Sequence, residues 1–267
     1  TPAELSDWAW RVPFVIGGVF GLISIYLRRF LQETPVFKKM RESKALAKFP
    51  LEEVVKTSRF GIWISMFITW VLTGCIVVFI LLMPGFVGGV LGFSPFETTY
   101  FQMGGLVCIV SSCWLTGRLA DKHNPSTLCI LFSAGFAVSS VAFFSLLYTA
   151  APVVSEVVLA YFATCFFAGI MNFCPIFMCD VFPARIRFSG ISFAYNIAYA
   201  LSGAFTPQLS FALHAYAKTH PDTLGAMGLS AYIVFLALVS IGTALAMRRV
   251  YKNGGAAVSQ MEFRPAP

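Results

Sequence analysis

Charged residues are scarce in this chain of 267 residues: they make up 12 % of it, whereas hydrophobic residues make up 58 %. A water-soluble domain typically carries charge on about a quarter of its residues, so the scarcity excludes an ordinary soluble domain. The alternative is the buried helical core of a large soluble protein, but the long apolar runs have no polar stripe that could face water. The composition therefore predicts a membrane protein.

Sequence patterns of catalytic and metal sites are missing as well. The chain has no G-x-S-x-G, no H-E-x-x-H and no paired aspartates, and its three histidines lie between the apolar runs. Its seven cysteines lie in or at the ends of those runs, where we expect packing residues rather than disulfides. Cys174 and Cys179 do not have the spacing of a zinc site. We therefore expect no enzyme, no metal site and no cofactor.

Long apolar runs are what the chain has instead. A membrane-spanning helix needs about 20 apolar residues at about 1.5 Å each, and all runs but the slightly short first one meet that length. The sequence predicts an all-α membrane protein with seven transmembrane helices, over residues 12–27, 60–83, 96–119, 126–148, 157–178, 191–213 and 228–247. We expect Met83-Pro84-Gly85 to end the second span in a flexible outer segment.

Several helix boundaries are marked by residues that cap helices. Ser94-Pro95-Phe96-Glu97 has an N-cap serine, a proline at the first helical position and a glutamate at the third, which predicts the start of the third span. Asn124-Pro125 predicts the start of the fourth in the same way. Asn253-Gly254-Gly255 is expected to stop the last helix.

The basic residues lie almost entirely on one side of the predicted spans. If the spans alternate across the membrane, all but Arg11 and Lys218 of the 19 Lys and Arg residues fall on the same side. Cytoplasmic loops retain Lys and Arg, so we expect a cytoplasmic C-terminus. The net charge of +7 then reflects topology and contact with anionic lipid headgroups rather than nucleic-acid binding.

The chain begins at Thr1, without a methionine, and an odd number of spans places that residue outside. We expect a fragment whose earlier spans are missing. Its expected parts are the last span of an N-terminal half (1–28), a basic cytoplasmic linker (29–59), a six-helix transmembrane domain (60–250) and a cytoplasmic tail (251–267). The linker is expected to form short amphipathic helices at the membrane surface.

A short loop between the third and fourth spans reads Gly117-Arg118-Leu119-Ala120-Asp121-Lys122. It resembles the G-x-x-x-D-(R/K) signature of the major facilitator superfamily, although His123-Asn124-Pro125 replaces the usual glycine and basic tail. Glycine lets two helix ends approach closely, and an aspartate can bond the N–H groups of a neighbouring helix N-terminus. The resemblance implies conformational gating by Gly117, Asp121 and Lys122; a solvated turn is the alternative.

A second loop runs from Asp180 to Gly190 and reads D-V-F-P-A-R-I-R-F-S-G. It resembles the E-x-F-P-x-x-x-R-x-x-G loop of the same superfamily, with Asp180 where glutamate is usual. The resemblance implies that Pro183 breaks the helix, that Arg187 pairs with an acid and that Gly190 permits close packing. These four residues are further gating candidates.

A finer resemblance covers most of the chain. Residues 10–14 (W-R-V-P-F), 27–29 (L-R-R) and 33–37 (E-T-P-V-F), and later 190–196 (G-I-S-F-A-Y-N), are similar to the sixth and eleventh spans of the metabolite:proton symporter family. That family includes proline/betaine, α-ketoglutarate, citrate and shikimate carriers. The resemblance implies that the chain holds spans six to twelve, the last six forming the C-terminal half of a facilitator-type transporter.

The resemblance also implies a central cavity lined by the second and fifth spans, with further candidates on the sixth. Asn172 and Asn196 each place an amide where hydrocarbon would leave it unpaired, and Tyr195 and Tyr199 share one helical face. The aromatic residues could instead serve packing or interhelical hydrogen bonding. The expected substrate-binding residues are Trp70, Thr73, Asn172, Tyr195, Asn196 and Tyr199.

No acidic or basic residue lies in the middle third of any predicted span. Proton coupling needs a titratable group within the membrane, so we expect the coupling carboxylate in the missing half. Aromatic faces attract quaternary ammonium groups, and this half offers no intramembrane arginine for a carboxylate. We therefore favour a zwitterion such as proline or betaine over a carboxylate.

The sequence thus predicts secondary active transport of a small organic solute by proton symport with alternating access, in the bacterial inner membrane. The expected partners are the solute, a proton, the lipid bilayer and the missing N-terminal half. A non-transporting fragment of such a carrier is the main alternative. A channel or an intramembrane enzyme is less favoured, because the chain shows neither a charged pore ring nor a catalytic cluster.

Overall fold

The computed structural model of the protein describes residues 4, 7–30, 38, 41–42, 49–220 and 227–252. These residues form helices joined by short turns, and no strand occurs among them, which confirms the predicted all-α class. The chain divides into two units, one before residue 47 and one after it, and each is described by itself.

The first unit contains one long helix. The short 3₁₀ helix η1, Ala9–Arg11, leads directly into α2, Val12–Arg28. Pro13 lies in the first turn of α2, where its missing N–H leaves no helical bond unmade. The Arg11 guanidinium lies 4.4 Å from the centroid of the Trp10 ring, an arrangement that suits a membrane–water interface.

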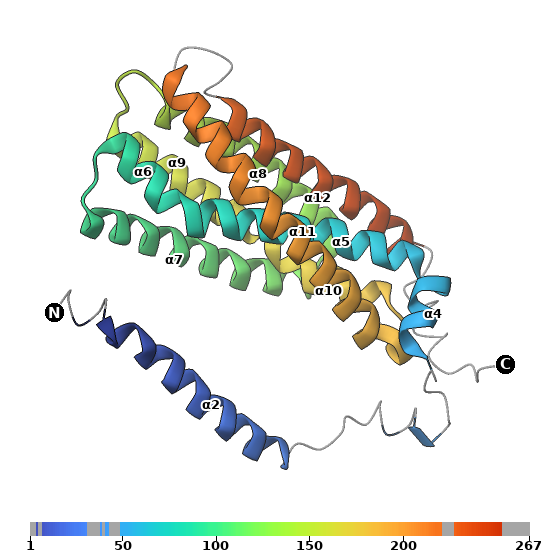
Figure 1. Ribbon diagram of the computed structural model, residues 1–267. Coiled ribbons are helices and arrows are strands. Elements are labelled where there is room, and N and C mark those ends of the chain that lie inside the picture. Colours follow the sequence, from blue (N-terminus) through green and yellow to red (C-terminus); the bar gives the residue numbers. More distant parts are fainter. Residues whose placement is uncertain are drawn as a thin grey trace. The chain divides into compact units, whose positions relative to one another are not determined.

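The second unit is a bundle of helices (Figure 1). The two most extensive helix pairings join α8 to α12 and α5 to α11. The elements in chain order are α4 (Pro50–Thr57), α5 (Arg59–Cys75), η2 (Ile76–Leu82), α6 (Met83–Leu91), α7 (Pro95–Ala120), α8 (Pro125–Leu147), α9 (Val154–Phe167), η3 (Ala168–Asn172), α10 (Phe173–Val181), α11 (Ala184–Thr219) and α12 (Gly228–Lys252).

Six helices among the described residues are long and apolar enough to cross a membrane: Ala9–Arg28, Arg59–Leu91, Pro95–Ala120, Pro125–Leu147, Val154–Val181 and Gly228–Lys252. The seventh expected span, residues 191–213, lies within α11, which is the longest helix but less apolar than the other six. The count of seven spans therefore stays a prediction.

The second predicted span does not end at Met83, which corrects the expectation of a flexible segment after it. A π-helical segment, η2, joins α5 to α6, and the helix continues to Leu91, where Gly92 adopts a left-handed conformation with φ of 69°. Pro84 has no N–H and cannot continue the ladder of backbone bonds. The wider π turn and the side chains of neighbouring helices accommodate it, as is usual for prolines within membranes.

Two side chains donate to the carbonyls that an N–H at residue 84 could have reached. In α-helical spacing residue 84 would donate to the carbonyl of Ile80, and in π spacing to that of Phe79. Gln102 of α7 donates its Nε2 to the Ile80 carbonyl at 2.7 Å, and Tyr161 of α9 donates its hydroxyl to the Phe79 carbonyl at 2.9 Å. Side chains of α7 and α9 thus stabilise the helix at Pro84, where its own backbone hydrogen-bond ladder is incomplete.

The fifth predicted span is interrupted as well. Pro175 lies in the first turn of α10 and cannot donate to the carbonyl of Met171, four residues earlier; the chain there forms the 3₁₀ segment η3. Within η3, Gly169 packs so closely against the Ser112 side chain of α7 that a Cβ would collide with it. A third proline, Pro207, lies inside α11. Two helices of the bundle are therefore irregular at a proline, and α11 contains a proline within a continuous α-helix.

The predicted starts of the third and fourth spans are confirmed. The Ser94 hydroxyl accepts a bond from the Glu97 N–H at 3.3 Å, and the Glu97 carboxylate accepts one from the Ser94 N–H at 2.7 Å, which is a capping box. The Asn124 side chain accepts a bond from the Ser126 N–H at 2.9 Å. The expected stop at 253–255 lies outside the described residues.

Candidate functional site

A polar and aromatic cluster joins α5, α11 and α12. Trp70 of α5 donates its Nε1–H to the Tyr232 hydroxyl of α12 at 3.3 Å, and that hydroxyl lies 2.7 Å from the hydroxyl of Thr206 on α11. The Phe205 ring meets the Trp70 ring edge-on, with 6.1 Å between centroids. Trp70 is half-buried, so one part of the indole fixes three helices while another part stays accessible.

The two threonines one turn apart on α5 are buried. Thr73 donates its hydroxyl to the Thr69 carbonyl at 2.9 Å, within the helix itself. The Thr69 hydroxyl lies 3.7 Å from the sulfur of Cys174 on α10. Thr73 therefore uses its hydroxyl to satisfy a backbone carbonyl, and its side chain is covered in this conformation.

Asn172, the last residue of η3, is tied to α7. Its Nδ2 donates to the Cys113 carbonyl and to the Thr116 hydroxyl, both at 3.2 Å. A Cβ on Gly117 would lie 3.4 Å from the same Nδ2. The amide that hydrocarbon would leave unpaired thus finds partners on the helix that carries the first loop signature, so a shift of α7 would act directly on Asn172.

The candidates on α11 lie on its more exposed surface. The rings of Tyr195 and Tyr199 stack with 5.4 Å between centroids, as their spacing predicts. Tyr199 is 38 % exposed, and Tyr195 is half-buried. Asn196 is exposed and donates its Nδ2 to the Ser192 carbonyl at 2.7 Å. These three side chains therefore present parts of two aromatic rings and an amide at the surface of the bundle.

The structure brings the six substrate-binding candidates together only in part. No hydrogen bond or ring contact among the described residues joins Trp70, Asn172 and the tyrosine pair to one another. Sequence reasoning missed Tyr232 and Thr206, the partners of Trp70. The sequence did mark Tyr232 as a tyrosine within an apolar run. Its partner Trp70 lies 162 residues away, so local spacing could not predict the pair.

The second loop signature forms a tightly packed cluster at the end of the bundle where α4 lies, here called the α4 end. The Phe182 ring is completely buried between Gly61 of α5 and Gly190 of α11. A Cβ added to Gly61 would lie 2.8 Å from the ring, and one added to Gly190 would lie 2.6 Å from it. Val54 of α4 and Ile186 of α11 complete this cluster. Gly190 thus provides space for the phenylalanine of its own loop.

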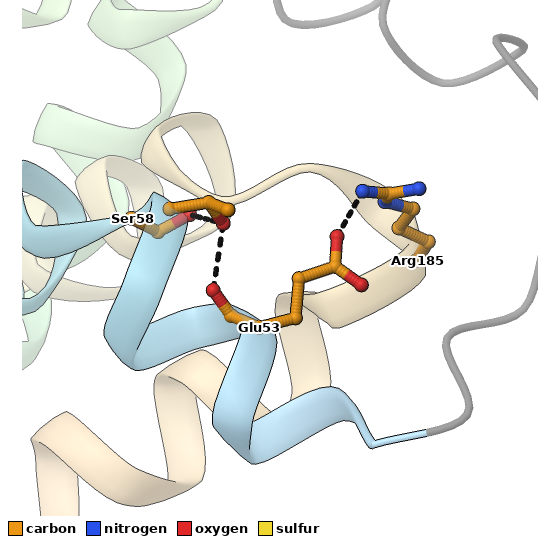
Figure 2. A network of polar contacts seen from close by, with 4 residues as sticks. Glu53, Ser58 and Arg185 are labelled. Atoms are coloured by element: carbon orange, nitrogen blue, oxygen red, sulfur yellow. Dashed lines mark hydrogen bonds and ion pairs between the residues drawn. The ribbon is translucent and has the colours of Figure 1, made fainter. Parts of the chain in front are cut away.

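An ion pair fastens α4 to the same loop. Figure 2 shows the Glu53 carboxylate directed at the Arg185 guanidinium at the start of α11, and the two groups form a hydrogen-bonded ion pair. Both side chains are about three-quarters buried. Arg187 points its Nε–H to the Phe182 carbonyl at 3.1 Å. Helix α4 is therefore bound to the start of α11 and to Phe182 by this ion pair and by the buried Val54.

The remaining gating candidates lie at the same end. Asp180 accepts a hydrogen bond of 2.6 Å from the Tyr251 hydroxyl of α12. Pro183 lies at the break between α10 and α11. Asp121 and Lys122 are exposed just after α7, and within the described residues the Asp121 carboxylate bonds no helix N-terminus. Its gating role stays a prediction that requires a neighbouring helix from elsewhere.

Replacing Glu53 by glutamine is expected to lower the free energy of unfolding by about 1–2 kcal/mol, because Arg185 would lose a charged partner in a largely buried position. Glu52→Gln is the matched control: its pair with Lys56 is mostly exposed, so the loss should stay below about 0.5 kcal/mol. The double exchange E53R/R185E should recover part of the loss. Equal effects of the two glutamine variants in detergent-titrated unfolding would contradict the assignment.

Residues 3–207 match the family described as Major Facilitator Superfamily. The chain is 28 % identical over 243 residues to the inner membrane metabolite transport protein YhjE of Escherichia coli, covering 86 % of this chain and 52 % of the relative. It is 27 % identical over 222 residues to the citrate-proton symporter of Klebsiella pneumoniae, covering 80 % of this chain and 48 % of the relative. It is 23 % identical over 208 residues to a putative proline/betaine transporter of Staphylococcus haemolyticus, covering 77 % of this chain and 44 % of the relative. The chain spans about half the length of these curated relatives. No solved structure gives a significant match.

Proposed function

The chain belongs to the Major Facilitator Superfamily, and we propose that it forms the C-terminal half of a secondary transporter for a small organic solute. The superfamily predicted from the two loop signatures is confirmed, and the relatives are named as transporters, not as enzymes. The observation that carries the proposal is the placement of Trp70 and Asn172 on the two proline-interrupted helices. Interrupted helices form the solute sites of many secondary transporters.

Alternating access would use the interruptions as points of bending. The missing N–H of Pro84 leaves the backbone ladder incomplete there, so the helix can bend at the cost of the side-chain bonds from Gln102 and Tyr161 rather than of backbone bonds. Asn172 sits beside Gly117 at the end of α7 and would sense movement of that loop. The proposed cycle rocks this half against a second half around a solute held between them.

A zwitterion is the solute that the described side chains favour. No Asp, Glu, Lys or Arg lies in the middle of a helix in the described six-helix unit, whereas the exposed surface of α11 and the half-buried Trp70 offer aromatic rings. Ring faces attract a quaternary ammonium group. A solute carboxylate would be bound by amide and hydroxyl donors here, or by a cation of the second half.

The proposed coupling ion is the proton, and the proposed location is the bacterial inner membrane with the C-terminus in the cytoplasm. The α4 end carries Arg59, Arg118, Arg185, Arg187 and the basic end of α12, whereas Lys218 lies at the other end of α11. Basic residues are retained on the cytoplasmic side. The coupling carboxylate would then belong to the second half, as would the helix end that Asp121 approaches.

Uptake into liposomes tests the proposal. The complete protein that contains this chain is expected to accumulate labelled glycine betaine or proline when an inward proton gradient is imposed, and a protonophore should abolish the accumulation. The chain alone should accumulate nothing, because one half cannot alternate. Accumulation by the chain alone would contradict the half-carrier proposal. A folded complete protein that carries none of a zwitterion, citrate or α-ketoglutarate would contradict transport.

Trp70→Ala is expected to raise the KM for glycine betaine by about 10-fold, because it removes a ring face worth about 1–2 kcal/mol to a bound cation. Trp70→Phe retains a ring but loses the hydrogen bond to Tyr232, and should raise the KM less. Tyr232→Phe removes the same bond and is the matched control. Equal KM increases for the alanine and phenylalanine variants at position 70 would show that the ring face is unimportant.

A further inference from the structure

A lateral groove lies between the N-terminal half of α5 and the second half of α12. Figure 1 shows these parts of the two helices near α4. Its volume is about 360 Å³. The α5 side is aromatic and includes Phe60, Trp63 and Phe67; Trp63 and Phe67 stack with 5.7 Å between centroids. The groove is distinct from the cluster around Trp70 and from the packed ring of Phe182.

The α12 side of the groove is built from small residues. Gly242 and Ala246 lie one turn apart along it, and a Cβ on Gly242 would meet no atom within 4 Å. Thr243, between them, is almost completely buried and donates its hydroxyl to the Val239 carbonyl at 2.8 Å. The groove therefore offers open apolar space beside exposed aromatic rings, which suits a hydrocarbon chain.

The end of the groove is positively charged. Arg59 precedes Trp63 by one helical turn, and Arg249 follows Ala246 by three residues, so helical spacing places both arginines on the groove side of their helices. Both are exposed, and no described acidic residue pairs with either. Lys56 nearby is already paired with Glu52 at 2.5 Å. Helical spacing thus places two arginines that have no acidic partner among the described residues beside one end of the apolar groove.

We propose that this groove binds one anionic phospholipid, with its phosphate between Arg59 and Arg249 and an acyl chain along Trp63 and Gly242. The groove from Arg59 to Phe67 is about 12 Å long at about 1.5 Å per residue, which fits within one leaflet of a hydrocarbon core about 30 Å thick. Basic residues at the interface attract anionic headgroups, each raising affinity by about 5-fold. The proposal requires only that the helices span a membrane and does not depend on transport.

Native mass spectrometry of the protein in detergent, titrated with phosphatidylglycerol or phosphatidylcholine, tests the site. The wild type is expected to retain one phosphatidylglycerol at concentrations where it retains no phosphatidylcholine. R59Q/R249Q should weaken that binding about 25-fold. The control R118Q/K122Q removes two cations from the same end, away from the groove, and should weaken it less than 3-fold. Equal losses in both variants, or equal retention of the two lipids, would overturn the proposal.

Two further variants separate a lipid from a protein occupant. Gly242→Leu adds a side chain at a position where a Cβ meets no atom within 4 Å, and should lower phosphatidylglycerol retention at unchanged helical content. A photo-reactive benzoylphenylalanine at position 63 should cross-link to phospholipid in vesicles. A cross-link to a second copy of the chain, or to another half of the carrier, would show that the groove is a protein interface and would overturn the lipid assignment.

Discussion

Replacing Phe182 by alanine is expected to lower the free energy of unfolding by about 3–5 kcal/mol, the range for removal of a fully buried phenylalanine. The ring fills the space that Gly61 and Gly190 leave between α5 and α11, and it supports Val54 of α4. The cavity would therefore loosen three elements at once. Unfolding in mixed micelles with a denaturing detergent, followed by circular dichroism, measures the loss.

Two matched variants show whether the packing is as described. Phe182→Leu keeps most of the apolar volume and should lose about half as much stability. Phe188, in the same loop, is 85 % exposed, so Phe188→Ala should cost less than about 0.5 kcal/mol. If the alanine variants at 182 and 188 lost equal stability, the burial of Phe182 between the two glycines would be wrong.

The double variant Q102L/Y161F is expected to lose about 2–5 kcal/mol of unfolding free energy. It removes the side-chain donors of the Ile80 and Phe79 carbonyls beside Pro84, and each buried acceptor left unpaired costs about 1–3 kcal/mol. Each single variant should lose about half of the total. The same unfolding titration measures all three.

Pro84→Ala provides the decisive control because it supplies the missing N–H. In the alanine background residue 84 can donate to Ile80 in α spacing or to Phe79 in π spacing, so Q102L/Y161F should cost at least 1 kcal/mol less than in the wild type. Gln208→Leu, at an exposed position of α11, is the matched control for loss of an amide. Additive effects of Pro84→Ala and Q102L/Y161F would contradict the compensation.

The helical architecture could be predicted because a helix that crosses hydrocarbon must be about 20 residues long, have mostly apolar side chains and pair its backbone groups internally. The boundaries with side-chain caps, at Ser94 and Asn124, were predicted correctly for the same local reason. The interruptions were not predicted. Pro84 reads as the end of a helix in sequence, and only the partners supplied by Gln102 and Tyr161, distant in the chain, allow the helix to continue.

The individual residues of the candidate site could be predicted from the sequence, but the contacts between them could not. The tyrosine pair follows from spacing along one helix, and the need of Asn172 for a partner follows from its membrane depth. The identity of that partner, on α7, and the links among Trp70, Tyr232 and Thr206 depend on how helices cross. The role of Phe182 as the common neighbour of two glycines and α4 also required the fold.

The central proposal is that Tyr199, on the exposed surface of α11, borders a watery solute pathway, whereas Leu245 of α12 faces lipid. Cysteine labelling tests it most directly, in a variant of the complete protein that lacks native cysteines. Tyr199 and Leu245 have comparable exposure in the bundle, 38 % and 48 %. A cysteine at 199 is expected to react with a membrane-impermeant maleimide and to be protected by the transported solute, while one at 245 stays unreactive. Equal reactivity at the two positions, or a cysteine at 199 that never reacts, would contradict the account.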